Sequence, residues 1–375
     1  MRILVLNYEF PPLGGGAAPV TKNLASNITS RGHQVDLVTM AYGDLPKREE
    51  IGKVNVYRVP CIRSKKSMCH PHEMLSFLPT GFLKSRELIN KNDYDLVHAH
   101  FIIPTGTISY LLSRLYDIPY AITIHGSDVP GYNPDRFTHL HKLTLPIWKK
   151  VIDRSNKIIS PSKYLSDLLQ THNQGADIEI IPNGFNYEQY NPHREKENRI
   201  LVTSRLFERK GIQYLLEALS KIGNVEENWD VVIAGDGPYK GHLEKKVQKL
   251  DLNEKFKVKF TGWVEGEELL NLLETSRIFV FPSSHENCPV ALQEAMASGN
   301  AVIASDKSGT VEVIRDAGIT VDPEDIDEFS QKIKTIVQNK QLEEKLRERA
   351  STRVREEYNW SKITNQYLAT FKESR

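Results

Sequence analysis

This sequence of 375 residues has few cysteines, almost no net charge and no long apolar run. The three cysteines, Cys61, Cys69 and Cys288, are an odd number without paired spacing, so neither a disulfide framework nor a zinc site is indicated. Lys plus Arg total 49 and Asp plus Glu total 48, so the chain has no strong positive electrostatic field that would attract nucleic acid. The apolar run at 1–6 is too short for a signal peptide, and no run approaches the length of a membrane span. We therefore expect a cytoplasmic protein that does not cross a membrane.

Short β-branched runs alternate with amphipathic segments along the whole chain, which is typical of βα units and parallel sheets. The length exceeds that of one common core, so two domains are expected. First-half strands are predicted at 2–7, 34–39, 54–59, 95–99, 120–124, 157–160 and 178–181. A second series is predicted at 199–204, 230–234, 257–260, 278–281 and 301–304.

This pattern predicts an α/β fold of two Rossmann-like, doubly wound parallel-sheet domains facing across a cleft. The polar linker 191–198 and the turn residues at 181–184 place the domain boundary near residue 186. Open α/β sheets bind ligands outside the carboxyl ends of their strands. The cleft is therefore the expected site.

Two glutamates, Glu286 and Glu294, stand near the start of a predicted helix that follows a buried strand. Pro289 fits the helix start because its missing N–H costs nothing in the first turn. Two acceptors beside free backbone N–H groups could hold a polyhydroxylated ligand that carries phosphate. The alternative is that both are ordinary helix carboxylates, one near the N-terminus and one solvated.

Arg205 follows a predicted strand of the second domain, and Lys210 precedes the next helix. An arginine fork and a lysine point charge on one strand-loop-helix corner can both reach one diphosphate. Ordinary surface solvation is the alternative for each.

The glycines at 14–16 follow the first strand and precede a helix, so the backbone could approach a ligand there. They match neither the dinucleotide fingerprint nor the nucleoside triphosphate loop. A flexible turn is the alternative.

His125 ends a first-domain strand, where a neutral imidazole can hydrogen-bond a sugar hydroxyl or a developing charge. His98 and His100 share a strand face, but the chain supplies no convincing third ligand. Asp93 and Asp95 resemble an Asp-x-Asp metal clamp, yet they precede a strand instead of following one. No metal is predicted.

The segment 61–86 is bulky and basic, and it includes Arg63, Lys65 and Lys66. It could dock on an anionic membrane or cover an acceptor pocket. The alternative is an ordinary loop and core helix, because Glu73 and Glu87 interrupt the basic patch.

Taken together, these motifs resemble the retaining nucleotide-sugar glycosyltransferases of the GT-B fold, specifically glycosyltransferase family 4. The resemblance runs nearly end to end, and its order and spacing are specific. Its carriers are the glycines at 14–16, Arg31-Gly32-His33, Thr123-Ile124-His125-Gly126, Ser160-Pro161-Ser162, Ile181-Pro182-Asn183-Gly184, Ser204-Arg205-Leu206 with Lys210-Gly211, Gly235-Asp236-Gly237-Pro238, the segment 262–264 and the paired glutamates.

The resemblance implies that Arg205 and Lys210 neutralise the departing diphosphate, that Glu286 binds donor-sugar hydroxyls and that His125 contacts the donor sugar. It also implies a donor-binding set of Gly15, Gly16, Val264, Pro289, Val290, Ala291 and Glu294. Within that set, Glu294 would hold the ribose and the backbone of Val264 would meet the base. The family likeness further implies no metal or other cofactor and a UDP- or GDP-sugar as donor.

The final segment resembles a helix that crosses back onto the first domain. The expected domains are thus 1–185 plus about 359–375, and 186–358. Two departures from the family pattern stand out: Cys288-Pro289 where Phe-Gly is common, and Phe185-Asn186 where an aspartate often follows the Pro-Asn-Gly turn. Proline removes one N–H donor, so phosphate contacts would shift to Val290 and Ala291.

The predicted function is transfer of a hexosyl unit, with retention, from a nucleoside diphosphate sugar to a hydroxyl acceptor in cell-envelope polysaccharide or glycolipid synthesis. The expected partners are a glycan or lipid-linked acceptor and, through 61–86, the inner face of the membrane. Two alternatives stay open: a sugar-nucleotide epimerase on the same fold, and a protein that binds a sugar nucleotide without turnover.

Overall fold

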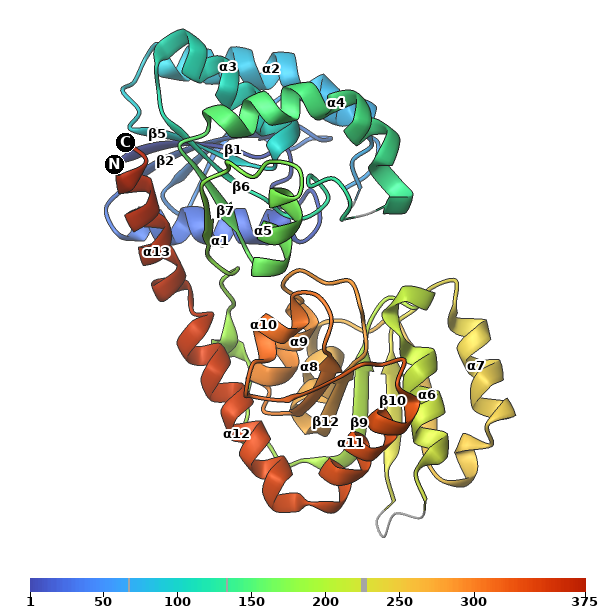
Figure 1. The fold of residues 1–375 in the computed structure, drawn as a ribbon. Coiled ribbons are helices and arrows are strands. Elements are labelled where there is room, and N and C mark those ends of the chain that lie inside the picture. The colour runs from blue at the N-terminus through green and yellow to red at the C-terminus, as the bar shows by residue number, and fades with distance from the viewer. Residues whose placement is uncertain (67, 133, 224–227) are drawn as a thin grey trace. The chain divides into compact units, whose positions relative to one another are not determined.

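The computed structural model describes residues 1–66, 68–132, 134–223 and 228–375 and divides the chain into two compact units (Figure 1). Unit 1 comprises Met1–Gly184 and Trp360–Arg375, and unit 2 comprises Phe185–Asn359. Each boundary differs by one residue from the expected one.

Unit 1 is built on an eight-stranded sheet in the order β3-β4-β2-β1-β5-β6-β7-β8. Every neighbouring pair is parallel except β3 with β4, where the charged strand β3 forms an antiparallel edge. The strands are β1 (Arg2–Leu6), β2 (Gln34–Met40), β3 (Arg48–Ile51), β4 (Val54–Val59), β5 (Leu96–His100), β6 (Tyr120–Thr123), β7 (Lys157–Ser160) and β8 (Ile178–Ile180).

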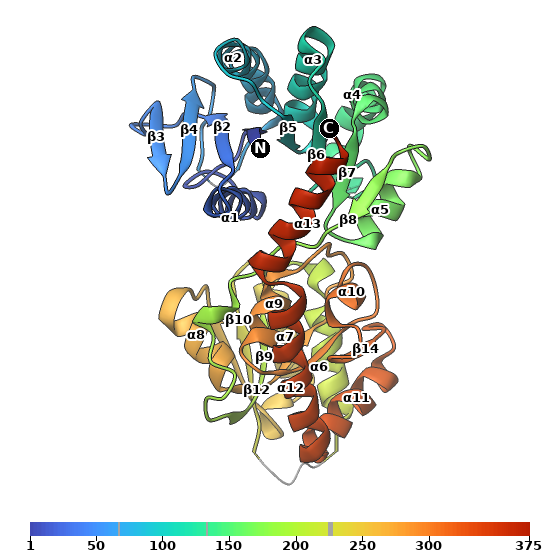
Figure 2. The ribbon, with the colours of Figure 1, turned by 90° about the vertical axis from the view of Figure 1, so that its left-hand side faces the viewer.

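Helices cover both faces of this sheet, because successive strand residues point to opposite sides. Leu4 and Leu6 pack into a core with helices α2, α3, α4 and α5, whereas Ile3 and Val5 pack with α1 and α13. Figure 2 shows α2, α3 and α4 on one face and α1 with α13 on the other. The helices are α1 (Ala17–Ser30), α2 (Pro71–Ile89), α3 (Thr107–Tyr116), α4 (Pro134–Arg154), α5 (Lys163–Gln170) and α13 (Trp360–Glu373).

The last helix returns to unit 1, as the sequence predicts. A Cβ placed on Gly184 would lie 2.4 Å from the Trp360 ring, so glycine is required where α13 begins. Arg31, at the end of α1, donates hydrogen bonds to Ser361 and Asn365 of α13. These contacts hold the chain terminus beside α1.

Unit 2 is built on a six-stranded, all-parallel sheet in the order β11-β10-β9-β12-β13-β14. Helices α6, α7 and α11 share one core, and α8, α9, α10 and α12 share the other. The strands are β9 (Glu197–Thr203), β10 (Asp230–Ala234), β11 (Lys257–Gly262), β12 (Ser276–Phe281), β13 (Ala301–Ser305) and β14 (Ile319–Val321). The helices are α6 (Ile212–Lys221), α7 (Lys240–Lys249), α8 (Gly266–Thr275), α9 (Val290–Ala297), α10 (Thr310–Ile314), α11 (Ile326–Gln338) and α12 (Lys340–Glu357).

The predicted fold class, two doubly wound α/β domains, is confirmed. Two short strands, β3 and β14, were not expected from the sequence. In both sheets the strand order reverses at one point, between β1 and β5 in unit 1 and between β9 and β12 in unit 2. Ligands of doubly wound folds bind outside the carboxyl ends of the strands at such points.

Candidate active site

The reversal point of unit 2 brings together the two loops that the sequence singles out. Arg205 and Lys210 follow β9, and the segment with Glu286 follows β12. Because β9 and β12 are adjacent and parallel, both loops leave the same edge of the sheet side by side. The predicted cationic and acidic residues therefore share one corner of the fold.

Lys210 and Glu286 form an ion pair at this corner, with Lys210 Nζ donating to Glu286 Oε1. Their side chains are only 11% and 17% exposed, so the pair is shielded from most of the solvent. Ser283 Oγ donates to the same carboxylate oxygen at 2.7 Å. A shielded ion pair interacts more strongly than an exposed one.

The backbone of Glu286 is held on both sides by the loop after β13. Its N–H donates to Ser308 Oγ at 3.0 Å, and its carbonyl accepts from the Gly309 N–H at 2.9 Å. A Cβ on Gly309 would lie 1.7 Å from the carbonyl oxygen of Asn287, so only glycine permits this approach. Three neighbouring strand ends thus fix the position of one carboxylate.

Glycine also positions Lys210. The next residue, Gly211, has a φ of 71°, and a Cβ there would lie 2.3 Å from the Pro282 carbonyl oxygen. The loop after β9 therefore rests directly on the chain that leaves β12. Because Gly211 has no Cβ, the two loops can pack this closely, and Lys210 contacts Glu286.

Arg205 lies at the same strand end but is exposed, with its guanidinium 5.9 Å from the centre of the Phe207 ring. Among the described residues it forms no ion pair with a carboxylate. The preceding residue, Ser204, packs closely on Gly235, where a Cβ would lie 1.8 Å from the Ser204 carbonyl oxygen. The structure thus brings Lys210 to Glu286 and leaves Arg205 turned toward solvent.

Glu294 lies within α9 and is partly buried, which differs from the solvated alternative considered above. The Tyr190 hydroxyl donates to its Oε1 at 3.3 Å. Burial raises the pKa of Glu294, while the hydrogen bond from Tyr190 acts in the opposite direction. A carboxylate held this way can accept from a hydroxyl group of a ligand.

The start of α9 lies where the sequence places it. Pro289 is the N-cap residue, helical residues begin at Val290, and no side chain caps the first turn. Backbone N–H groups at an uncapped helix start suit an anion. Val264, after β11, is half-buried against the same hydrophobic cluster as Ala291.

In unit 1, His125 follows β6 and contacts a second histidine. His100 Nδ1 and His125 Nε2 are 3.0 Å apart, and their rings are stacked with centres 5.2 Å apart. The backbone N–H of His125 donates to Asp128 Oδ1 at 3.0 Å, which fixes the turn after the strand. His125 therefore has a defined orientation at the strand end.

His98 and His100 are fully buried on one face of β5, with ring centres 4.4 Å apart. Burial lowers the pKa of His98 to about 3 and that of His100 well below its usual value. His98 Nε2 lies 2.8 Å from Thr123 Oγ1. In the described part of the chain, no group of three or more His, Cys, Asp or Glu residues could hold a metal ion.

The glycine loop of unit 1 is anchored at one end and open at the other. A Cβ on Gly14 would lie 2.5 Å from Glu9, whereas one on Gly15 or Gly16 would meet nothing within 4 Å. Gly15 N–H donates to Glu9 Oε2 at 3.2 Å. The backbone at Gly15 and Gly16 is therefore accessible at the start of α1.

The segment 61–86, whose residue 67 lies outside the described residues, departs from the expected basic patch. The side chain of Arg63 is only 1% exposed. Its guanidinium lies 3.8 Å from the Glu9 carboxylate and donates to the carbonyls of Lys65 and Lys66. Glu73 is also buried and accepts from the N–H groups of Ser64 and His70. Including Arg63 in a basic surface was therefore wrong, and Glu73 does not interrupt that surface.

Several residues of the site were missed by the sequence reasoning. Ser308 and Gly309 follow β13, the next strand of the sheet, so a search of every strand end could have found them. Tyr190 lies just before the linker and carries no such signal. In the described residues, no helix is both long and apolar enough to cross a bilayer.

Comparison with known proteins gives a consistent result. Residues 185–353 match the family model for glycosyl transferases group 1, and residues 14–189 match glycosyltransferase family 4. An uncharacterized glycosyltransferase of Methanocaldococcus jannaschii is 30% identical over 99% of this chain and 98% of its own. The alpha-monoglucosyldiacylglycerol synthase of Streptococcus pneumoniae is 24% identical over 81% of this chain and 71% of its own.

Among solved structures, Anabaena HepE in complex with UDP is similar, with a TM-score of 0.73 at 18% identity, covering 99% of this chain and all of HepE (100%). The sheet orders, the strand-end site and these matches agree with one another. The chain belongs to the GT-B glycosyltransferases of family 4.

Proposed function

We propose that this glycosyltransferase moves a hexosyl unit from a UDP- or GDP-sugar to a hydroxyl acceptor, with retention of configuration and without a metal. The observation that carries the proposal is the shielded Lys210–Glu286 pair, with Arg205 beside it, at the reversal point of unit 2. Breaking a glycosyl phosphate bond builds negative charge on the departing diphosphate. Fixed cations next to that charge lower the barrier.

The proposed roles follow from where each group lies. Arg205 and Lys210 would bind the diphosphate, with help from the N–H groups of Val290 and Ala291 at the start of α9. Glu286 would accept hydrogen bonds from the sugar hydroxyls, because its carboxylate is held by Ser283 and Lys210.

The nucleoside would be held farther along unit 2. Glu294 would accept from the ribose, and the backbone of Val264 would meet the base, next to the helix start at Pro289. In unit 1, His125 and the open backbone at Gly15 and Gly16 are proposed to contribute to donor binding. The likeness to HepE, solved with UDP, supports testing uridine donors first.

A thermal-shift panel of nucleoside diphosphates and their sugars tests this proposal. A ligand at a hundred times its Kd stabilises the folded state by about 2.7 kcal/mol, which is easily measured. We expect a shift with UDP- or GDP-sugars and a smaller one with the free diphosphate. No shift with any member of the panel would contradict the proposal.

The proposed setting is cell-envelope polysaccharide or glycolipid synthesis at the inner face of the membrane, in the cytoplasm. The pneumococcal relative, a glucosyldiacylglycerol synthase by name, supports a glycolipid acceptor. Lys65, Lys66 and Met68 are exposed on one loop before α2 and could contact anionic lipid. Co-sedimentation with phosphatidylglycerol vesicles tests this contact, and it should weaken when both lysines are changed to glutamine.

A further inference from the structure

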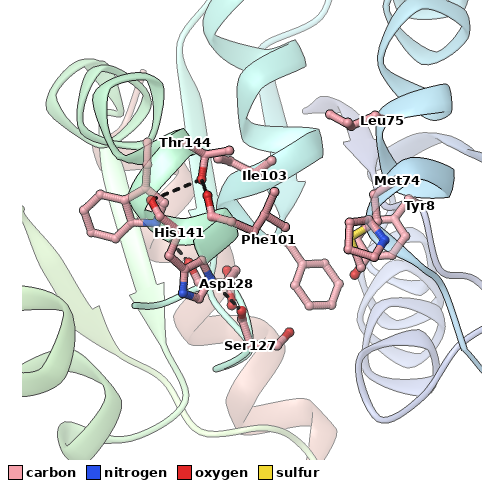
Figure 3. A pocket seen from close by; sticks show the side chains of 12 residues that line it. Tyr8, Met74, Leu75, Phe101, Ile103, Ser127, Asp128, His141 and Thr144 are labelled. Atoms are coloured by element: carbon pink, nitrogen blue, oxygen red, sulfur yellow. Dashed lines mark hydrogen bonds between the residues drawn. The ribbon is translucent and has the colours of Figure 1, made fainter. Parts of the chain in front are cut away.

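Unit 1 contains an apolar pocket between α2 and α4 that none of the proposed roles uses (Figure 3). Met74, Leu75 and Tyr8 lie on one side and Ile103 and Thr144 on the other, with the Phe101 ring between them. Apolar walls with a few polar groups are typical of small-molecule sites.

Two of the polar side chains around the pocket, Asp128 and Trp148, are already bound to other parts of the protein. The Asp128 carboxylate accepts from three backbone N–H groups, those of His125, Gly126 and Ile102. Trp148 Nε1 donates to the Asp128 carbonyl at 2.9 Å. The surface that lines the pocket is therefore mainly apolar, which favours an apolar ligand over a sugar ring.

The pocket is open and is not a sealed void in the core. Leu75 is 50% exposed at its edge, whereas Phe101 and Trp148 are buried at its base. An exposed leucine beside a recessed apolar wall gains free energy when a ligand covers both. This arrangement fits an apolar chain that enters from solvent.

The base of the pocket adjoins the strand-end residues of unit 1. The Phe101 ring lies 4.7 Å from the His125 ring and 4.9 Å from the Tyr8 ring, measured between ring centres. Tyr8 immediately precedes Glu9, which holds the glycine loop. An occupant of the pocket would therefore end next to His125.

Phe101 is held in a conformation that costs free energy. Its φ is 75° and its ψ is 145°, a region that residues with a side chain rarely adopt. Hydrogen bonds with Thr123, Thr105 and Gly106 hold its backbone there. Backbone strain of this kind concentrates at ligand sites.

We infer that this pocket binds the alkyl or prenyl chain of an amphiphilic acceptor, whose hydroxyl-bearing head lies toward His125. The inference rests on the proposed function and names the class of acceptor. A purely polar glycan would leave the apolar wall of the pocket uncovered.

The experiment uses monomeric butyl, hexyl and octyl glucoside as probes, each titrated into the full chain by calorimetry below its micellar concentration. Each methylene that enters the pocket should tighten binding roughly fourfold, until the pocket is full. The heat-capacity change on binding should grow more negative along the same series. An affinity that does not depend on chain length would overturn the inference.

Matched variants separate the pocket from the helix surface around it. Leu75→Gln changes a pocket residue of α2, and Leu83→Gln changes a residue of the same helix that is 59% exposed but does not line the pocket. We expect Leu75→Gln to weaken octyl glucoside binding at least fivefold and Leu83→Gln to leave it unchanged. Equal losses in both would mean that the chain adsorbs to the surface.

Thr144→Phe provides a second variant, which fills the pocket and keeps its wall apolar. It should also weaken octyl glucoside binding, and the thermal shift with nucleotide should persist, which shows that the chain is folded. Octyl glucoside binding that survives both Leu75→Gln and Thr144→Phe would overturn the inference.

The two proposals fail in different ways. A thermal shift with nucleotide but no chain-length dependence overturns the acceptor class alone. Chain-length dependence without any nucleotide shift overturns the proposed function, and with it the assignment of the bound chain to an acceptor.

Discussion

The two units share a doubly wound fold but present opposite chemistry at their reversal points. In unit 2 the strand ends carry a shielded ion pair, Lys210 with Glu286, held by glycine contacts. In unit 1 the corresponding edge carries buried neutral histidines and an apolar pocket. The comparison teaches that the fold supplies a place for ligands, and the side chains at the strand ends decide which ligand.

The largest expected effect comes from breaking the charged corner of unit 2. Lys210→Ala and Glu286→Gln should each lower the transfer rate by about 100-fold or more, because each removes a proposed contact, to developing charge or to the sugar. Since the two side chains touch, the double variant should lose far less than the product of the single losses. Steady-state kinetics on the three variants measures this.

Lys221→Ala is the matched control, because Lys221 also forms an ion pair, with Asp327, but on the exposed surface of unit 2. Exposed pairs contribute little, so its rate should stay near that of the wild type. If Lys210→Ala and Lys221→Ala behaved alike in folded protein, the assignment of the site would be wrong.

A smaller effect concerns stability in acid and should distinguish the two units. Burial holds the pKa of His98 at about 3 in the folded state, below its unfolded value, so the unfolded chain takes up protons first. Above about pH 6.5 His98 is neutral in both states and does not lower the free energy of unfolding. As the pH drops from there toward 3, the free energy of unfolding falls. The slope is about 1.4 kcal/mol per pH unit. By contrast, His193, His242 and His285 of unit 2 are exposed.

Hydrogen exchange of the core strands measures this difference. Between pH 7 and 5, protection of β5 and β6 should fall more than that of β9 and β12. Asp128 opposes the trend, since burial raises its pKa to about 6 and its protonation then favours the folded state as the pH falls. His98→Gln isolates the histidine: the decline in unit 1 should become shallower, and an unchanged decline would argue against this origin.

Most of the fold could be predicted from the sequence because its strands are short, apolar and buried on both faces. Such runs, as in β1 and β9, are recognised by composition alone. The missed strand β3 reads Arg-Glu-Glu-Ile, and only its antiparallel pairing with β4 makes it a strand. The missed β14 has three residues. Both depend on neighbours that local sequence does not show.

The site was predictable to the extent that it follows strand ends. Lys210 and Glu286 were each placed by their strands, and the adjacency of β9 and β12 brings them together. Arg63 shows the limit, because its burial against Glu9 joins segments far apart in the sequence. The apolar pocket likewise depends on helix packing, to which α2 and α4 both contribute.

The smallest expected effect tests Glu294 through its neighbour. Tyr190→Phe removes the hydroxyl that donates to Glu294 and leaves a partly buried carboxylate with one donor fewer. The pKa of Glu294, already raised by burial, should rise further, because that hydrogen bond favours the charged form. A lost hydrogen bond of this kind costs about 1 kcal/mol, so nucleoside diphosphate affinity should fall about fivefold.

Calorimetric titration with UDP and GDP at pH 6 and pH 8 measures this loss. Because the pKa of Glu294 is raised and should rise further in the variant, the loss should be larger at the lower pH. Tyr187→Phe is the control, because Tyr187 packs against the same hydrophobic cluster as Tyr190. If both tyrosine variants bound nucleotide equally well at both pH values, Glu294 would not be the ribose contact. A loss confined to Tyr190→Phe would place the nucleoside beside α9 and sharpen the contrast with the apolar pocket of unit 1.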